Sequence, residues 1–445
     1  MKASYYNFFY PYESDKDKFI AYNSLSNALA LIEKDKYEVF MEFCKHNKTI
    51  EDLDLINDLK KGFFLLDDHV NEKHLIRFRM LQNRFSTSSF GLTIAPTSDC
   101  NFRCIYCYEK DVIKPAYMSA DVQDRIVELL QNNLSTISRF SVSWYGGEPL
   151  LALDVIESLS ARFIELCEKK EVAYGAGIIT NGYLLNRDTI QLLNKLKVNF
   201  IQVTIDGTPD VHNRRRPLVD GGETFDTIFN NLKESYDILP TVALRINVDR
   251  NNIDSGKYVY EYLKKNEMLG KITLYLGKTS NDNDCYETVE CLNMCDYAKV
   301  DYEYALSLFD DKKEIVKYPY IKSNFCGADS YNSFVIDAFG DLYKCWSDIG
   351  VEDRCVGNIA EAKNVTNTTF FDYLLFDPTA NKPCSMCNLL PVCMGGCPYK
   401  RLNEESDNCS LYKYVLEECI KNATSFLKEE LLEKKKDEKI SNEIS

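Results

Sequence analysis

The chain lacks any long apolar run and any excess of positive charge. Its first residues, MKASYYNFFYPYESDKDK, contain no basic stretch followed by an apolar one, and nowhere do about 18 uncharged apolar residues follow one another. The formal net charge is -15. Nucleic acids and anionic membranes are bound by basic faces, so neither is expected as the main partner. We predict a soluble, unexported, cytoplasmic protein that acts on a protein or a small molecule.

The length and the cysteine content set two further limits. A chain of 445 residues exceeds the size at which one core stops growing, so two or three domains are expected. Seventeen cysteines in a protein without an export signal are available to metals rather than to disulfides. Ten of them fall into spaced groups. The other seven fit no standard group and are expected to be small buried apolar side chains: Cys44, Cys167, Cys285, Cys291, Cys295, Cys355 and Cys419.

Residues 1–86 are expected to form a small winged-helix-like α+β domain. Aromatic-rich strands are predicted on either side of a polar turn, followed by a third apolar run, and two helical patterns precede a strand-like FFLL. A longer helical pattern then leads into the Ser/Thr cluster STSS, which is typical of a linker. The predicted strands cover 5–10, 19–22 and 28–32, and the predicted helices 37–44, 50–59 and 71–85.

Residues 87–280 alternate between strand and helix patterns. Strands are predicted at 92–95, 140–144, 176–180, 200–205, 243–248 and 272–276, with amphipathic helices such as 122–134 and 156–167 between them. Six such units predict a parallel sheet that curves into a partial (β/α)6 barrel, an α/β fold whose reactive groups follow the strand C-termini.

The rest of the chain loses this regularity. Residues 281–325 are expected to bridge the barrel to a cysteine-rich domain over 326–425. The last segment, 426–445, is a charged helical pattern expected to fray, and we assign it no chemistry.

The first cysteine group stands directly after the first predicted strand. The stretch APTSDCNFRCIYCYEK places Cys100, Cys104 and Cys107 on one loop with C-x3-C-x2-C spacing. Three thiolates can hold three corners of a cubane iron-sulfur cluster, which leaves one iron open for a chelating cosubstrate. A structural zinc loop is the alternative, although zinc sites favour C-x2-C pairs with a second pair of ligands.

At these residues the sequence resembles the radical S-adenosylmethionine (SAM) superfamily, whose signature is C-x3-C-x2-C after the first strand of a partial TIM barrel. The resemblance covers about residues 90–280. It implies that Cys100, Cys104 and Cys107 are catalytic and hold a [4Fe-4S] cluster, whose open iron binds SAM.

The resemblance also implies the SAM contacts. Gly146, Gly147, Glu148 and Pro149 match the family's GGEP element, in which backbone carbonyls and Glu148 engage the SAM ammonium. By the same resemblance Thr180 and Asn181 reach the ribose, Thr204 and Arg216 bind the carboxylate, and Tyr106 packs near the adenine. For GGEP the alternative is a tight turn whose acid is stabilised at a helix N-terminus. Thr180, Asn181, Thr204 and Arg216 would otherwise be hydrogen-bonded side chains at strand ends and part of a solvated basic run. For Tyr106 the alternative is ordinary packing within its loop.

Two further groups follow. Cys326 and Cys345 are spaced C-x13-G-x4-C around Gly340, and Cys384, Cys387, Cys393 and Cys397 read C-x2-C-x5-C-x3-C before Cys409. This composite resembles the SPASM extension of peptide-modifying radical SAM enzymes. It implies that Cys326, Cys345 and Cys397 bind auxiliary cluster I, that Cys384, Cys387, Cys393 and Cys409 bind auxiliary cluster II, and that the protein carries three [4Fe-4S] clusters in all.

Auxiliary cluster I is one ligand short in this pattern. Either Cys285, Cys291, Cys295 or Cys355 completes it, or one iron stays open to a substrate thiolate. A zinc ribbon would use only four of the seven cysteines in these two groups.

The resemblance implies a function. The N-terminal domain is similar to a peptide recognition element of three strands and three helices, whose edge strand accepts a leader peptide; domain packing without a ligand is the alternative. We expect hydrogen abstraction from a ribosomally made precursor peptide by a 5'-deoxyadenosyl radical and formation of a cysteine thioether, as in sactipeptide and ranthipeptide maturases, with flavodoxin or ferredoxin as electron donor. The alternatives are carbon-carbon crosslinking, epimerisation, formylglycine formation in a sulfatase, and a metal-stabilised peptide-binding module without catalysis.

Overall fold

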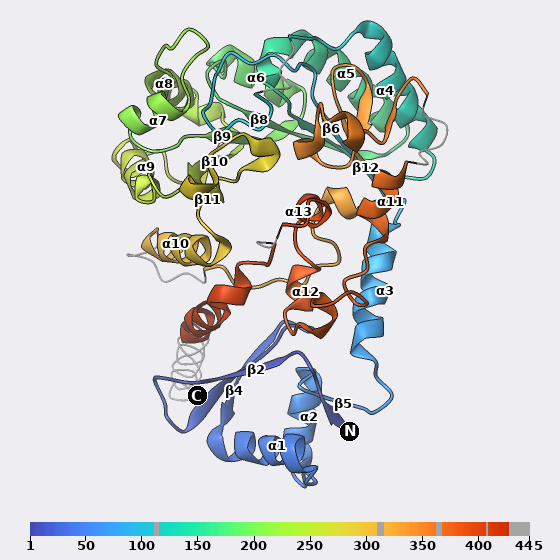
Figure 1. The fold of residues 1–445 in the computed structure, drawn as a ribbon, viewed down its shortest axis with the longest axis vertical. Helices are drawn as coiled ribbons and strands as arrows, with labels where there is room; N and C mark the ends of the chain where they lie inside the picture. The colour runs from blue at the N-terminus through green and yellow to red at the C-terminus, as the bar shows by residue number, and fades with distance from the viewer. Residues whose placement is uncertain (111–114, 309–315, 362–366, 406–407, 427–445) are drawn as a thin grey trace, which may run out of the picture.

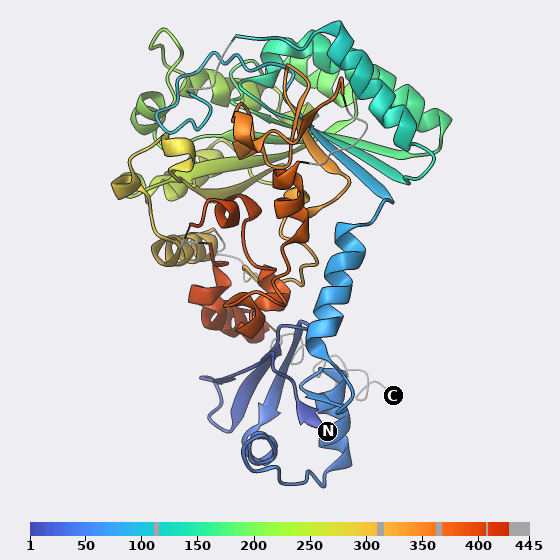
Figure 2. The same cartoon turned by 45° about the vertical axis from the view of Figure 1, so that its right-hand side comes forward.

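The computed structural model describes residues 1–110, 115–308, 316–361, 367–405 and 408–426. The predicted charged tail therefore lies outside the described residues, except for Phe426. Three parts follow one another along the long axis (Figure 1). The N-terminal unit lies at one end, the large sheet with its helices at the other, and the helices α12 (Leu390–Cys393) and α13 (Pro398–Leu402) of the cysteine-rich region lie between them. Figure 2 shows the same order from another side, with α3 running beside the middle part.

The large sheet contains the six predicted strands, all parallel and in chain order. They are β6 (Ser89–Ile94), β7 (Arg139–Trp144), β8 (Ala173–Thr180), β9 (Val198–Thr204), β10 (Thr241–Val248) and β11 (Ile272–Lys278). Each prediction is confirmed, with starts that differ by at most three residues. The helices between them are α4 (Ala120–Asn133), α5 (Leu153–Lys169), α6 (Arg187–Lys195), α7 (Pro209–Arg215), α8 (Phe225–Glu234) and α9 (Ser255–Lys265).

The two faces of this sheet differ in chemistry because side chains alternate along each strand. In β10, Val242, Leu244 and Ile246 belong to the main hydrophobic core. The intervening Arg245 and Asn247 point to the opposite face. Burial of the apolar face under the helices holds the sheet, and the polar face is left available for chemistry.

The cysteine-rich region extends the same sheet, which the sequence did not predict. Strand β12 (Ser333–Ile336) pairs parallel with β6, and β13 (Asp341–Tyr343) and β14 (Gly357–Asn358) follow in antiparallel order. The added strands cover the edge that β6 would otherwise expose. They also fix the chain around Cys345, which comes two residues after β13, against the sheet.

The N-terminal unit contains the predicted strands as β2 (Asn7–Pro11), β3 (Lys18–Asn23) and β4 (Ala28–Glu33), joined in antiparallel order. A second small sheet pairs β1 (Lys2–Ala3) with β5 (Leu65–Leu66). The helices are α1 (Lys34–His46) and α2 (Leu53–Lys61). Helix α2 begins at Leu53, three residues after the predicted start. The reason is Asp52, whose carboxylate caps the helix by accepting the N–H groups of Asp54 and Leu55.

Helix α3 (Glu72–Arg84), predicted at 71–85, joins the N-terminal unit to β6. Its last residue, Arg84, is buried and donates to the carbonyls of Leu374 and Phe376 at 2.9 and 2.6 Å. These carbonyls lie at the end of α11 (Thr368–Leu375). These hydrogen bonds therefore attach the end of α3 to the cysteine-rich region.

Helix α10 (Met294–Ser307) was not predicted, because its residues are a mixture of cysteine, tyrosine and acidic side chains with weak periodicity. Short helices α12 (Leu390–Cys393) and α13 (Pro398–Leu402) lie among the last cysteines. No helix within the described ranges is long and apolar enough to cross a membrane.

Candidate active site

A cavity of about 470 Å³ opens on the polar face of the sheet, at the C-terminal ends of the parallel strands. Its walls come from the first cysteine loop, the turn after β7, the ends of β8 to β10, the loop after β11, and Trp346 with Ser347. The structure brings together most of the residues that the sequence singled out: Cys100, Cys104, Cys107, Tyr106, Gly146, Gly147, Thr180, Asn181, Thr204 and Arg216.

The three cysteines of the first loop are free thiols, and each is partly buried. Burial raises the pKa of Cys107 to about 12. It also raises the pKa of Cys104, and the positive charge of Arg216 counteracts this rise. In the described part of the chain, no three His, Cys, Asp or Glu side chains converge as ligands of a single metal ion. A cubane differs because each thiolate binds a different iron. Three soft thiols on one loop beside a cavity fit such a cluster.

The turn after β7 holds the cysteine loop by close backbone contact. A Cβ at Gly147 would lie 2.1 Å from the carbonyl oxygen of Asp99, so only glycine fits there. The backbone N–H of the next residue, Glu148, donates to the same oxygen at 2.8 Å. The side chain of Asp99 accepts from the backbone N–H of Cys100 at 2.8 Å. These contacts fix where the cysteine loop begins.

Glu148 lies behind this turn and is fully buried. Its carboxylate accepts from the backbone N–H of Leu150 at 3.0 Å and from Thr180 Oγ1 and the Asn181 N–H, both at 2.7 Å. Burial raises the pKa of Glu148, and these donors counteract the rise. Neither Glu148 nor Pro149 lines the cavity, since Pro149 opens the buried 3-10 helix η1 (Pro149–Ala152). In this structure Glu148 positions Thr180 and Asn181, and its contact with a SAM ammonium stays a prediction.

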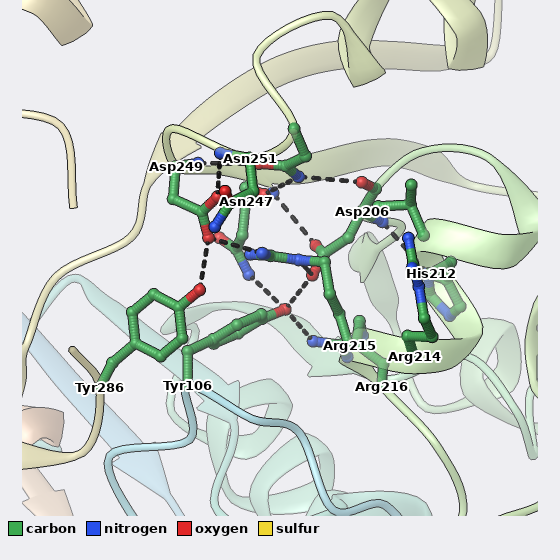
Figure 3. A network of polar contacts seen from close by, with 12 residues as sticks. Tyr106, Asp206, His212, Arg214, Arg215, Arg216, Asn247, Asp249, Asn251 and Tyr286 are labelled. Atoms are coloured by element: carbon green, nitrogen blue, oxygen red, sulfur yellow. Dashed lines mark hydrogen bonds and ion pairs between the residues drawn. The ribbon is translucent and has the colours of Figure 1, made fainter. Parts of the chain in front are cut away.

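Figure 3 shows how Tyr106 is fixed. Its hydroxyl donates to Asp206 Oδ2 at 2.6 Å and accepts from Arg216 Nη1 at 2.8 Å and from Asn247 Nδ2 at 3.0 Å. Burial raises the pKa of this phenol. The ring is therefore held among polar groups from three segments near the C-terminal ends of the strands, and its packing near an adenine stays a prediction.

Sequence reasoning missed Arg215, the neighbour of Arg216. Arg215 is buried and forms ion pairs with Asp206 at 3.0 Å and Asp249 at 2.5 Å (Figure 3). The basic run HNRRRP is thus only partly solvated. The signal that could have found it is that Asp206 and Asp249 each stand just past the end of a predicted strand, where parallel strands bring their loops together.

The cysteines predicted for auxiliary cluster I lie close to one another. Burial raises the pKa of Cys345, and the charges of Cys397 and Cys326 act in the same direction. Two of the four candidates for a missing ligand have partners elsewhere. The thiol of Cys285 donates to the carbonyl of Tyr106 at 3.3 Å, and that of Cys355 to the carbonyl of Gly357 at 3.1 Å.

The cysteines predicted for auxiliary cluster II also come together. Burial raises the pKa of Cys384, and the nearby thiols of Cys393, Cys387 and Cys409 add to the effect. Lys413 donates to the sulfur of Cys409 at 3.4 Å. A lysine beside a thiolate set offsets part of its negative charge.

The far wall of the cavity is aromatic. Trp346, the residue after Cys345, stacks on Tyr145 with ring centroids 5.5 Å apart. The hydroxyls of Tyr145 and Tyr108 are hydrogen-bonded to each other. The cavity therefore reaches from the first cysteine loop to the chain beside Cys345.

Comparison with known families agrees with this geometry. Residues 94–263 match the family model described as Radical SAM superfamily. These residues therefore form a radical SAM domain, and the protein is an enzyme. This sets aside the alternative of a peptide-binding module without catalysis.

Among curated relatives, the cysteine-type anaerobic sulfatase-maturating enzyme of Clostridium novyi (strain NT) is 27% identical over 387 residues, which cover 76% of this chain and 96% of the relative. Among solved structures, native anSMEcpe with bound AdoMet and Cp18Cys peptide superimposes with a TM-score of 0.57 at 20% identity, covering 76% of this chain and 99% of that one. Streptococcus suis SuiB bound to precursor peptide SuiA gives 0.53 at 15% identity, covering 92% and 98%. These structures show that the fold is shared.

Proposed function

We propose that this radical SAM enzyme matures a ribosomally made precursor peptide, by abstracting a carbon-bound hydrogen atom and joining a cysteine sulfur to that carbon. Cys100, Cys104 and Cys107 would hold the cluster that binds SAM. Cys326, Cys345 and Cys397 would hold auxiliary cluster I, and Cys384, Cys387, Cys393 and Cys409 would hold auxiliary cluster II. When bound, the first cluster and SAM supply a 5'-deoxyadenosyl radical.

The observation that carries the proposal is the extent of the cavity. One wall is the first cysteine loop and another is Trp346, next to Cys345. Formation of a thioether removes one hydrogen atom from carbon, one proton from the thiol and one further electron. A substrate held between these walls would have an electron acceptor at Cys345 within reach, and the aromatic wall of Trp346, Tyr145 and Tyr108 would exclude water.

The N-terminal unit supports a peptide substrate. Residues 87–445 are 359 of the 445 residues, about four fifths, so the 92% match to SuiB must include part of residues 1–86. SuiB was solved with a precursor peptide. In this chain β2 and β4 are the two edges of the small sheet, and either edge offers unpaired backbone groups to an added strand. We propose that residues 1–86 bind a leader peptide in this way.

The test is mass spectrometry of a candidate precursor peptide after anaerobic reaction with SAM and reductant. Loss of two hydrogen atoms per bond, together with loss of a free thiol, is expected. Epimerisation would leave the mass unchanged and introduce deuterium from heavy water, and a carbon-carbon crosslink would leave every thiol free. Either result would replace the thioether in the proposal.

Formylglycine formation is the second candidate, because the Clostridium novyi relative is a sulfatase-maturating enzyme that matches over almost its whole length. That reaction replaces a cysteine thiol by an aldehyde. Reaction of the product with a hydrazide reagent would therefore favour this candidate, whereas a thioether does not react.

A further inference from the structure

Arg245 lies on the polar face of β10 and lines the cavity. Its Nε donates to Asn247 Oδ1 at 2.7 Å. Asn247 in turn donates to the hydroxyl of Tyr106 at 3.0 Å. The guanidinium is thus oriented through Nε by a residue that is itself fixed.

The neighbouring strand leaves room for this side chain. A Cβ at Gly277 of β11 would lie 2.4 Å from Arg245 Nε and 2.7 Å from Cζ. The guanidinium therefore lies against the backbone of β11, with the ring of Tyr275 6.0 Å from Cζ. Contacts from two strands hold it, so little side-chain entropy remains to be lost when it binds a ligand.

Arg245 has no acidic partner within the described ranges of the chain, where no carboxylate lies at ion-pair distance from it. Other arginines of the barrel are occupied: Arg215 binds two aspartates, and Arg216 binds Tyr106 beside the cysteine loop. A guanidinium oriented through Nε presents its two terminal nitrogens as a planar fork. A carboxylate is the group that matches such a fork.

The charge of the whole cavity favours the same ligand. The protein carries a net charge of -15, yet among its described residues five cationic and two acidic side chains line the cavity. They are Arg103, Lys110, Arg216, Arg245 and Lys278 against Glu109 and Asp282. Cationic walls around a cavity concentrate anionic ligands there.

Arg245 also faces the peptide side of the cavity. Its positive charge reaches the phenol of Tyr145 and counteracts the burial that raises the pKa of that group. Tyr145 stacks on Trp346, next to Cys345. The positive charge of Arg216, by contrast, counteracts the rise in the pKa of Cys104 and Cys107, in the loop assigned to SAM.

We propose that Arg245 binds the carboxylate of an Asp or Glu side chain in the segment of the substrate peptide that enters the cavity. The substrate class is therefore a peptide with an acidic residue beside the modified position. This inference rests on the proposed peptide maturase function. Asn247 and Gly277 are positioning residues for Arg245.

The test titrates the SAM-loaded holoenzyme calorimetrically, at low salt, with blocked tripeptides that differ in one group. The probes are acetyl-Ala-Asp-Ala-amide and its Asn counterpart, and the same pair with Glu and Gln. The wild type is expected to bind at least one acid about tenfold more tightly than its amide, because a charge-assisted hydrogen bond is lost in the amide. Arg245→Met should abolish this preference, and Arg245→Lys and Gly277→Ala should each reduce it.

The matched control is Lys110→Met, which removes one charge from another wall of the same cavity. Lys110 is bound to the carbonyl of Cys285, so this variant should keep most of the preference. Equal binding of acid and amide, or no binding of either at millimolar concentration, overturns the inference. So does a loss of SAM affinity in Arg245→Met that matches the loss of peptide affinity, because the guanidinium would then bind SAM.

These outcomes are separate from those of the proposed function. If the acid preference depends on Arg245 but no peptide is crosslinked, the maturase reaction fails and the subsite stands. If crosslinking proceeds equally in Arg245→Met on an acidic peptide, the subsite fails and the function stands.

Discussion

His212 shows how burial at a single residue couples stability to pH. Its ring is buried, Nδ1 accepts from the backbone N–H of Asp206 at 3.1 Å, and Nε2 has no hydrogen-bond partner among the described residues. Burial and the charge of Arg216 lower the pKa of His212 from 6.5 to about 3. The folded protein therefore holds the neutral ring.

We predict a loss of stability on acidification that depends on this residue. The stabilisation is complete above the unfolded pKa and is lost as the pH falls from there toward the folded pKa. Between pH 7 and pH 5, this residue should lower the free energy of unfolding by about 2 kcal/mol. In His212→Asn, whose amide oxygen can replace Nδ1, the difference between unfolding free energies at the two pH values should be smaller by this amount. An unchanged pH dependence would show that the ring is charged or exposed.

At the residue scale, cysteine spacing and the family resemblance identified ten residues that line the cavity, but not others such as Arg245, Tyr145 and Trp346. Cys100, Cys104 and Cys107 are close in sequence, so their proximity needed no knowledge of the fold. The partners of Arg215 follow the ends of two different strands, and the role of Glu148 depends on Thr180 thirty-two residues later. Such contacts depend on register and burial, which one sequence does not reveal.

At the scale of elements, the glycine turn after β7 sets the position of the cysteine loop. We predict that Gly147→Ala displaces the loop at Asp99 and reduces the iron retained by the protein, because a Cβ would overlap a backbone oxygen. Gly175→Ala is the control, since a Cβ there meets only Asn199 Nδ2 at 3.8 Å. Iron analysis after reconstitution is the measurement. Equal iron in the two variants would contradict the role assigned to the turn.

Helix α3 is held at its end by Arg84. Arg84→Met should lower the unfolding free energy by about 2–4 kcal/mol, because one buried and one partly buried carbonyl lose their donor and Asp329 loses a nearby charge. On the same helix, Arg77 pairs with Asp377 at the surface, and Arg77→Met should cost about 1 kcal/mol or less. Denaturant unfolding of both variants compares the two. Similar small losses would mean that Arg84 does not fasten the helix.

The elements themselves were largely predictable. Six strands followed from runs of Val, Ile and Leu between amphipathic helices, since burial on one face leaves a clear pattern. The pairing of β12 with β6 was not predictable, because it joins segments about 240 residues apart. Helix α10 was missed because its apolar residues do not repeat at helical spacing.

At the scale of the whole molecule, the three groups of cysteines predict three clusters. Reconstituted protein should bind about twelve iron atoms, and removal of any one group should lose about four. Suitable variants are Cys104→Ala with Cys107→Ala, and Cys384→Ala with Cys387→Ala. Cys167, buried in α5 outside every group, is the control. If a double variant keeps its full iron content, the corresponding group is not a ligand set.

The central claim is that this enzyme takes a hydrogen atom from a peptide carbon. The most direct measurement uses a precursor peptide deuterated at carbon, with SAM and reductant under anaerobic conditions, and analyses 5'-deoxyadenosine by mass spectrometry. We predict that deuterium appears in 5'-deoxyadenosine with the wild type, and that Cys104→Ala forms none of this product. A modified peptide accompanied by 5'-deoxyadenosine free of deuterium, or by no 5'-deoxyadenosine, would contradict the claim.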